Sequence, residues 1–156
     1  MSDTARPSAR RTVLFVCVEN AGRSLMAEAI FNADPPPGWL AASAGTRPAS
    51  AANSRTAPML GEIGLELPPH PPRALTPELM ERASLHVTMG CLDDASCPAR
   101  LKSLAPRDWA LDNPARLDDN GFRRVRDAIR AKVAELRLEL TSGQWPDTGS
   151  PPVPRP

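Results

Sequence analysis

The strongest constraint on the fold comes from residues 11–32, RTVLFVCVENAGRSLMAEAIFN, where a strand pattern runs directly into a helix pattern. The six apolar residues 13–18 are typical of a strand that is covered on both faces. After a short polar turn, apolar residues recur from Leu25 to Ala33 with the spacing of one helix face. A strand that turns straight into a helix begins a βα unit, so the rest of the chain has to supply parallel neighbours for that strand.

Further strand and helix patterns alternate along the chain. Strands are predicted at 39–45, 84–90 and, as a short edge strand, 108–112, and helices at 53–64, 76–83 and 122–140. Because right-handed crossover helices join parallel strands, this order predicts an α/β fold, a small doubly wound domain of three layers (α/β/α) with a parallel sheet of about four strands. Such sheets bind ligands beyond the carboxyl ends of their strands, where we expect four residues to gather: Cys17, Gly45, Cys91 and Asp112.

The length of 156 residues fits one domain, which we place at residues 12–141. The segments 1–11 and 142–156 lack apolar periodicity, and the second is rich in proline, so both are expected to be disordered. No apolar run is long enough to span a membrane and no leader-like segment precedes the first strand, which favours a cytoplasmic protein. The net charge of +1 is spread along the chain and argues against nucleic-acid and membrane partners; we expect a monomer.

The turn between the first strand and the first helix has the form CX5R, with Cys17 at the strand end and Arg23 at the helix start. A loop of this length can turn its backbone N–H groups inward, and the helix N-terminus adds partial positive charge, which together bind a tetrahedral oxyanion. Arg23 can donate two parallel hydrogen bonds to that oxyanion. The same field stabilises a thiolate, so Cys17 is expected to act as a nucleophile, with a hydrogen bond from Ser24. The predicted oxyanion-binding residues are those that follow the cysteine: Val18, Glu19, Asn20, Ala21, Gly22, Arg23 and Ser24.

A structural interpretation of this loop stays open at this point. Cys17 would then be a small apolar residue that ends a strand, and Arg23 a solvated residue of the first helical turn. The CX5R spacing alone favours that interpretation. The buried strand before it, the helix after it, and Asn20 and Gly22 inside the loop favour the catalytic one.

Several motifs together resemble one known superfamily. VLFVCVENAGRS followed by MAEAI, and then SAGT, VTMGC, DWALDNPA and FRRVRDAI, are similar to the low-molecular-weight protein tyrosine phosphatase superfamily. Within it, the resemblance is closest to arsenate reductases of the thioredoxin-coupled type, and it covers residues 12–140. The resemblance implies the fold of that superfamily, arsenate as substrate, thioredoxin as reductant and no tightly bound cofactor.

The resemblance also implies a role for each of the three cysteines. Cys17 attacks arsenate, Cys91 attacks the sulfur of the resulting arseno-cysteine and releases arsenite, and Cys97 resolves Cys91 as a disulfide that thioredoxin reduces. A disulfide requires Cα atoms within about 7 Å, which neither a helix nor an extended chain provides over six residues, so this segment has to bend. Cys91 and Cys97 both follow the third predicted strand closely, so both are expected on the rim where Cys17 lies. Structural burial of Cys91 and Cys97 is the alternative. A zinc site is not expected, because only His70 and His86 could complete it.

The family pattern is broken at the position of the general acid. Where the superfamily has an Asp before a Pro, this chain has Asn113, so either Asp112 supplies the proton or no protein acid does. Arsenate loses a hydroxyl as water readily, whereas a phosphate ester gains more from a protein acid, so Asn113 favours arsenate reduction over ester hydrolysis. The absence of Tyr from the chain likewise favours a small inorganic oxyanion over phosphotyrosine.

A second departure concerns the monovalent cation that some of the resembled reductases bind near the loop. In those reductases a carboxylate helps to bind the cation, and the matching position here is Arg73. Its guanidinium would replace the cation by pairing with Glu28; a solvated Arg73 is the alternative. Three other functions stay open from the sequence: a tyrosine phosphatase, a reductase that uses a low-molecular-weight thiol in place of Cys91, and a non-catalytic oxyanion-binding module.

Overall fold

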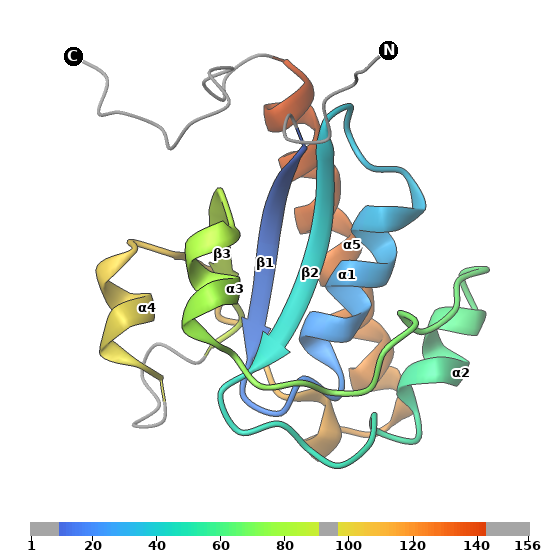
Figure 1. Ribbon diagram of the computed structural model, residues 1–156. Helices are drawn as coiled ribbons and strands as arrows, with labels where there is room; N and C mark the ends of the chain where they lie inside the picture. Colours follow the sequence, from blue (N-terminus) through green and yellow to red (C-terminus); the bar gives the residue numbers. More distant parts are fainter. Residues whose placement is uncertain (1–9, 91–96, 143–156) are drawn as a thin grey trace.

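The structure, a computed structural model, describes residues 10–90 and 97–142 (Figure 1). Its centre is one parallel sheet in the order β2-β1-β3-β4. The strands are β1 (Arg11–Cys17), β2 (Trp39–Gly45), β3 (Leu85–Thr88) and β4 (Arg107–Asp108). The helices are α1 (Arg23–Ala33), α2 (Thr56–Gly61), α3 (Pro77–Arg82), α4 (Ala99–Ser103) and α5 (Asp119–Thr141), with a 3-10 turn, η2 (Pro114–Arg116).

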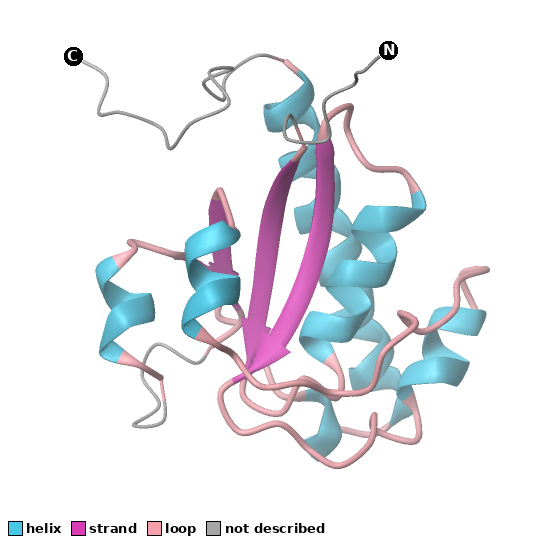
Figure 2. Cartoon of the chain, viewed as in Figure 1, coloured by secondary structure: helices cyan, strands magenta, loops and turns pink. Residues whose placement is uncertain are grey.

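Helices cover both faces of the sheet, as Figure 2 shows. Alternate residues of β1 point to opposite faces, so Phe15 and Cys17 belong to one apolar cluster, and Leu14 and Val16 to the other. The first cluster is completed by α1, α2 and α5, and the second by α3 and α4. The predicted three-layer α/β domain with a four-stranded parallel sheet is therefore confirmed.

Most elements begin and end where local signals place them. Thr76 caps α3 by accepting a hydrogen bond from the Leu79 N–H, with Pro77 in the first turn, and Asp118 caps α5 in the same way through Gly121. The apolar stripe of α5 is buried along its length at the positions predicted from helical spacing: Phe122, Val125, Ile129, Val133, Leu136 and Leu140.

Two local predictions are wrong, and two short elements were not predicted. The helix predicted at 53–64 begins only at Thr56, because the Asn53 side chain accepts the Arg55 N–H and folds residues 53–55 into a turn. The edge strand predicted at 108–112 is reduced to β4, after which the backbone leaves the strand conformation with Ala110 at a φ of 51°. Neither α4 nor η2 was predicted, since both are too short to show an apolar period.

The predicted disordered ends, 1–11 and 142–156, fall almost entirely outside the described residues. Arg11 already belongs to β1, where it pairs with Trp39, and Ser142 caps the end of α5. Within the described ranges, no helix combines the length and the apolar character needed to cross a membrane.

Candidate active site

The loop after β1 turns its carbonyl groups toward a neighbouring segment. Four carbonyls, those of residues 17, 18, 19 and 21, accept hydrogen bonds of 2.7 to 3.1 Å from backbone N–H groups of one segment: Thr46, Arg47, Ala49 and Asn53. With these carbonyls engaged on its outer side, the loop has its N–H groups left for the inner side, where an anion can bind. Gly22 precedes α1 without a side-chain cap, so the helix N-terminus is also open to an anion.

The sulfur of Cys17 is surrounded by hydrogen-bond partners at the end of β1. Its Sγ lies 2.9 Å from Ser24 Oγ and accepts the backbone N–H of Asn20 at 3.2 Å. Ser24 Oγ in turn accepts a hydrogen bond from Asn20 Nδ2 at 2.7 Å. The Nδ2 group can only donate, so the Ser24 hydroxyl has its own proton available for the Cys17 sulfur. A hydrogen bond from that hydroxyl stabilises a thiolate.

Asn20 holds the loop in shape from a fully buried position. Besides Ser24, its Nδ2 donates to Ser43 Oγ at 3.0 Å, and its Oδ1 accepts the Arg73 N–H at 3.0 Å. Its φ of 50° is in the left-handed region, which asparagine tolerates better than most residues. The loop also requires Gly45 at the end of β2, because a Cβ there would lie 2.7 Å from the Val18 carbonyl oxygen.

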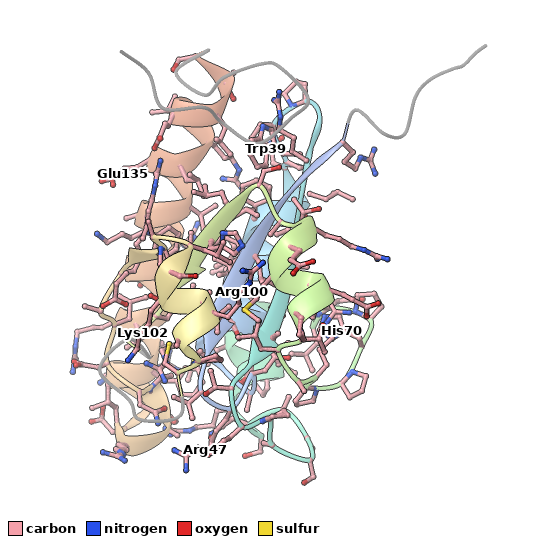
Figure 3. The ribbon with its side chains drawn as sticks, turned by 60° about the vertical axis from the view of Figure 1, so that its left-hand side comes forward. Trp39, Arg47, His70, Arg100, Lys102 and Glu135 are labelled. Atoms are coloured by element: carbon pink, nitrogen blue, oxygen red, sulfur yellow. The ribbon has the colours of Figure 1, made fainter. Side chains whose placement is uncertain are left out.

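Beneath the loop, Glu28 is paired with His70 and not with Arg73. Glu28 Oε1 accepts a hydrogen bond from Ser43 Oγ at 2.5 Å and lies 2.9 Å from His70 Nε2, whereas Arg73 donates through Nε to the Ser43 carbonyl. The predicted pairing of Arg73 with Glu28 is therefore wrong, and Arg73 is half-buried. Because Ser43 and His70 already contact Glu28 Oε1, a cation at this oxygen would have to displace one of them. In Figure 3 His70 and Arg47, just beyond β2, lie toward the end of the molecule opposite Trp39, the first residue of β2.

Arg23 is nearly buried and is held by the segments that follow β3 and β4. Its Nη1 donates to the carbonyls of Met89 and Leu111, which fixes the guanidinium across the loop. Gly90, at a φ of 101°, makes room for it, since a Cβ there would lie 3.3 Å from Arg23 Nη1. The other N–H groups of Arg23 make no hydrogen bond to the described residues, so the guanidinium can still bind an oxyanion.

A pocket of about 300 Å³, part of it open to solvent, lies over Cys17. The loop, the start of η2 and α5 contribute its lining residues: Cys17, Glu19, Ala21, Gly22, Arg23, Asn53, Asn113, Pro114, Ala115 and Phe122. The structure thus brings Asn113 to the nucleophile. Asp112 is exposed and is not among these residues, so the one carboxylate that lines the pocket in the described part of the chain is Glu19.

Cys97 is placed differently from the expectation that it shares the rim with Cys17. Cys97 is 5% exposed and belongs to the apolar cluster on the opposite face of the sheet, with Leu101 and Met80. A small thiol before α4 is readily buried there, because free cysteine behaves as a small apolar residue. Cys91 lies outside the described residues.

The clearest pKa shifts lie away from the pocket, on α5 and its neighbours. Hydrogen bonds from Arg123 and Arg126 lower the pKa of Glu62 to about 2. A hydrogen bond from Arg107 lowers the pKa of Glu139. These ion pairs connect α5 with the end of α2 and with β4, and they stabilise the fold.

Several site residues escaped the sequence analysis. Ser43 offered one signal, a hydroxyl inside an otherwise apolar strand pattern, and His70 another, a histidine within a proline turn. Arg55, which contacts the η2 segment, showed no signal, because its partners are backbone groups far along the chain.

The sequence matches a known family over most of its length. The family model described as low molecular weight phosphotyrosine protein phosphatase matches residues 12–144. A putative arsenate reductase from Halobacterium salinarum is 32% identical over 127 residues, covering 78% of this chain and 87% of that protein.

Solved structures give the same picture. A thioredoxin-dependent arsenate reductase from Corynebacterium glutamicum has a TM-score of 0.70 at 28% identity, with 86% of this chain and 64% of that chain covered. The YwlE arginine phosphatase from Geobacillus stearothermophilus has a TM-score of 0.75 at 23% identity, with 86% and 95% covered, and shows the shared fold. The resemblance predicted from the motifs is confirmed by these matches.

Proposed function

Because the chain belongs to the low-molecular-weight phosphotyrosine protein phosphatase family, we propose that it reduces arsenate to arsenite with Cys17 as the nucleophile. Arg23 and the loop N–H groups hold the oxyanion, and Ser24 and Asn20 stabilise the thiolate that attacks it. The arsenate reductases among the relatives support this choice of substrate.

The observation that carries the proposal is the amide of Asn113 in the pocket over Cys17. An amide cannot protonate a departing alkoxide or phenoxide, which a phosphate monoester has to expel. Arsenate instead loses an oxygen that leaves as water. A pocket with a thiolate, a guanidinium and an amide therefore suits arsenate better than an ester.

The redox balance requires two sulfur atoms. Cys17 displaces water from arsenate and forms an S–As bond, after which a second thiolate attacks the Cys17 sulfur. The S–As electron pair then stays on arsenic, As(V) becomes As(III), and a disulfide forms. We propose Cys91 as the second thiol and Cys97 as the third, which attacks Cys91 and frees Cys17, with thioredoxin reducing the Cys91–Cys97 disulfide; the thioredoxin-dependent neighbour supports this reductant.

The buried position of Cys97 adds a requirement to this relay. Its thiol has to leave the cluster around Leu101 before it can reach Cys91, so turnover includes a local rearrangement near α4. We propose that the enzyme works in the cytoplasm as a monomer, where thioredoxin keeps its thiols reduced.

A phosphatase is the second candidate, favoured by the oxyanion cradle itself, which does not distinguish phosphate from arsenate. The remaining candidates are a reductase that uses a low-molecular-weight thiol and a non-catalytic oxyanion-binding module.

The test is arsenate-dependent NADPH oxidation with thioredoxin and thioredoxin reductase, run beside an aryl-phosphate assay on wild type, Cys17→Ser and Cys97→Ser. We expect NADPH oxidation by wild type alone. Aryl-phosphate turnover that survives Cys97→Ser, without NADPH oxidation, would instead establish a phosphatase. Arsenate turnover with a low-molecular-weight thiol but not with thioredoxin would identify a reductase that uses such a thiol. No turnover with any reductant would indicate a non-catalytic oxyanion-binding module.

A further inference from the structure

Arg55 connects two parts of the pocket that are far apart in sequence. Its guanidinium donates to the carbonyls of Leu117 at 2.8 Å, Pro114 at 3.1 Å and Ala115 at 3.4 Å. It also pairs with Asp119 at 3.2 Å and lies over the ring of Phe122, 4.8 Å from the ring centroid. One side chain therefore holds the whole η2 segment and the start of α5.

The backbone that carries Arg55 is itself tied to the loop after β1. The Ala21 carbonyl accepts both the Asn53 N–H at 2.9 Å and the Thr56 hydroxyl at 2.8 Å. On the other side, Pro114 packs on the loop, since a Cβ at Gly22 would lie 3.6 Å from Pro114 Cγ. Arg55 thus fixes the distance between the oxyanion loop and the wall of the pocket that faces it.

That wall presents Asn113 to the pocket with one polar group uncommitted. Asn113 Oδ1 accepts the Ala115 N–H at 3.1 Å, and this bond orients the amide. Its Nδ2 has no partner within residues 10–90 and 97–142, although the residue lines the pocket beside Cys17 and Arg23. An N–H donor that faces an anion pocket without a protein partner is a group that a bound oxyanion can satisfy.

We propose that Asn113 is an oxyanion-binding residue that donates from Nδ2, and that Arg55 is the positioning residue that holds it over Cys17. Asn113 occupies the place of a proton donor but acts as a neutral hydrogen-bond donor. Arg55 acts through Ala115 and Pro114, whose carbonyls it fixes. The inference concerns binding of a tetrahedral oxyanion and does not depend on arsenate being reduced.

The test is a double-mutant cycle on phosphate affinity in the full chain. We expect inorganic phosphate to protect Cys17 from iodoacetamide. The protection curve, read by mass spectrometry of the Cys17 peptide, then gives the affinity without any turnover. We expect Asn113→Ala and Arg55→Ala each to weaken phosphate binding about tenfold to a hundredfold, the value of one hydrogen bond to an anion. The double variant should be no weaker than either single variant, because both remove the same bond.

The matched control is Arg116→Ala, which also removes one arginine charge, from the η2 segment that Arg55 holds. Arg116 is exposed and makes no side-chain hydrogen bond within the described part of the chain, so phosphate affinity should change less than twofold. Free guanidinium at low concentration should restore affinity to Arg55→Ala but not to Arg55→Ala/Asn113→Ala. A purely structural role for Arg55 would show no such dependence on Asn113.

Three outcomes would overturn the inference. The first is that Arg55→Ala binds phosphate as tightly as wild type. The second is that the losses of affinity in the two single variants multiply in the double variant. The third is that phosphate does not protect Cys17 of wild type. Should Arg55→Ala fail to fold, Arg55→Lys replaces it in the cycle, because lysine keeps the charge but cannot reach three carbonyls at once. It should lose part of the affinity, again only when Asn113 is present.

Discussion

Replacing Asn20 tests whether the buried polar network at the end of β1 shapes the site. The side chain is fully buried and makes three hydrogen bonds, to Ser24, Ser43 and the Arg73 N–H. At about 1 kcal/mol net for each bond, Asn20→Gly should lower the free energy of unfolding by about 3 kcal/mol. Urea unfolding followed by fluorescence or circular dichroism measures this difference.

Comparison with alanine separates the hydrogen bonds from the backbone conformation. The φ of 50° costs an ordinary residue about 1 to 2 kcal/mol, whereas glycine's extra freedom in the unfolded chain costs about 0.5 to 1 kcal/mol. Asn20→Ala should therefore be less stable than Asn20→Gly, by up to about 1.5 kcal/mol. Both variants should also slow the alkylation of Cys17 by iodoacetamide, because Ser24 loses the donor that directs its proton to the sulfur.

Two results would refute this reasoning. One is an Asn20→Gly protein within about 0.5 kcal/mol of wild type, since the buried partners would then cost nothing when left unpaired. The other is unchanged alkylation of Cys17 in a variant that has lost stability, which would uncouple the network from the nucleophile.

Three further predictions concern other parts of the chain. Hydrogen bonds from Arg123 and Arg126 lower the pKa of Glu62 from its ordinary value of 4.5 to about 2. Its ion pairs therefore stabilise the fold at neutral pH and lose that effect as the pH falls from 4.5 toward 2. The stability difference between wild type and Glu62→Gln should shrink over that range, and a difference independent of pH in urea titrations would contradict it. Cys97 should react with iodoacetamide at least about tenfold more slowly than Cys17 in the native protein and equally fast in urea, because Cys17 lines the pocket and has hydrogen bonds that stabilise its thiolate, whereas Cys97 lies in the second apolar cluster. Equal native rates in peptide mapping would contradict this difference. Removing the charge of Glu19 should tighten phosphate binding about twofold to fivefold, from about 0.5 to 1 kcal/mol of relieved repulsion, and weaker protection of Cys17 in Glu19→Gln would show that the carboxyl helps to bind the anion.

The parts of the site that the sequence predicts well are those that local signals determine. The apolar run of β1, the loop of fixed length and the periodic α1 place Cys17 and Arg23 at the same end of the sheet without knowledge of any distant contact. The caps of α3 and α5 were predictable for the same reason, since Thr76 and Asp118 bond to N–H groups three residues later.

The parts that sequence analysis missed depend on contacts between distant segments. Glu28 is paired with His70, 42 residues away, and the proline-rich stretch between Leu67 and Arg73 gives no period from which to predict which basic residue reaches it. Cys97 follows β3 closely in sequence, so it was expected at the rim. Its side chain instead enters the cluster on the opposite face, because α3 and α4 build an apolar site there.

A single turnover without any reductant tests the central claim most directly. The fully reduced protein is mixed with arsenate under anaerobic conditions, and arsenite released and thiols lost are counted for each chain. The three-thiol account predicts one arsenite and two thiols lost per chain, with the Cys91–Cys97 disulfide found by peptide mapping and Cys17 still alkylatable. No arsenite with all three thiols intact would contradict it.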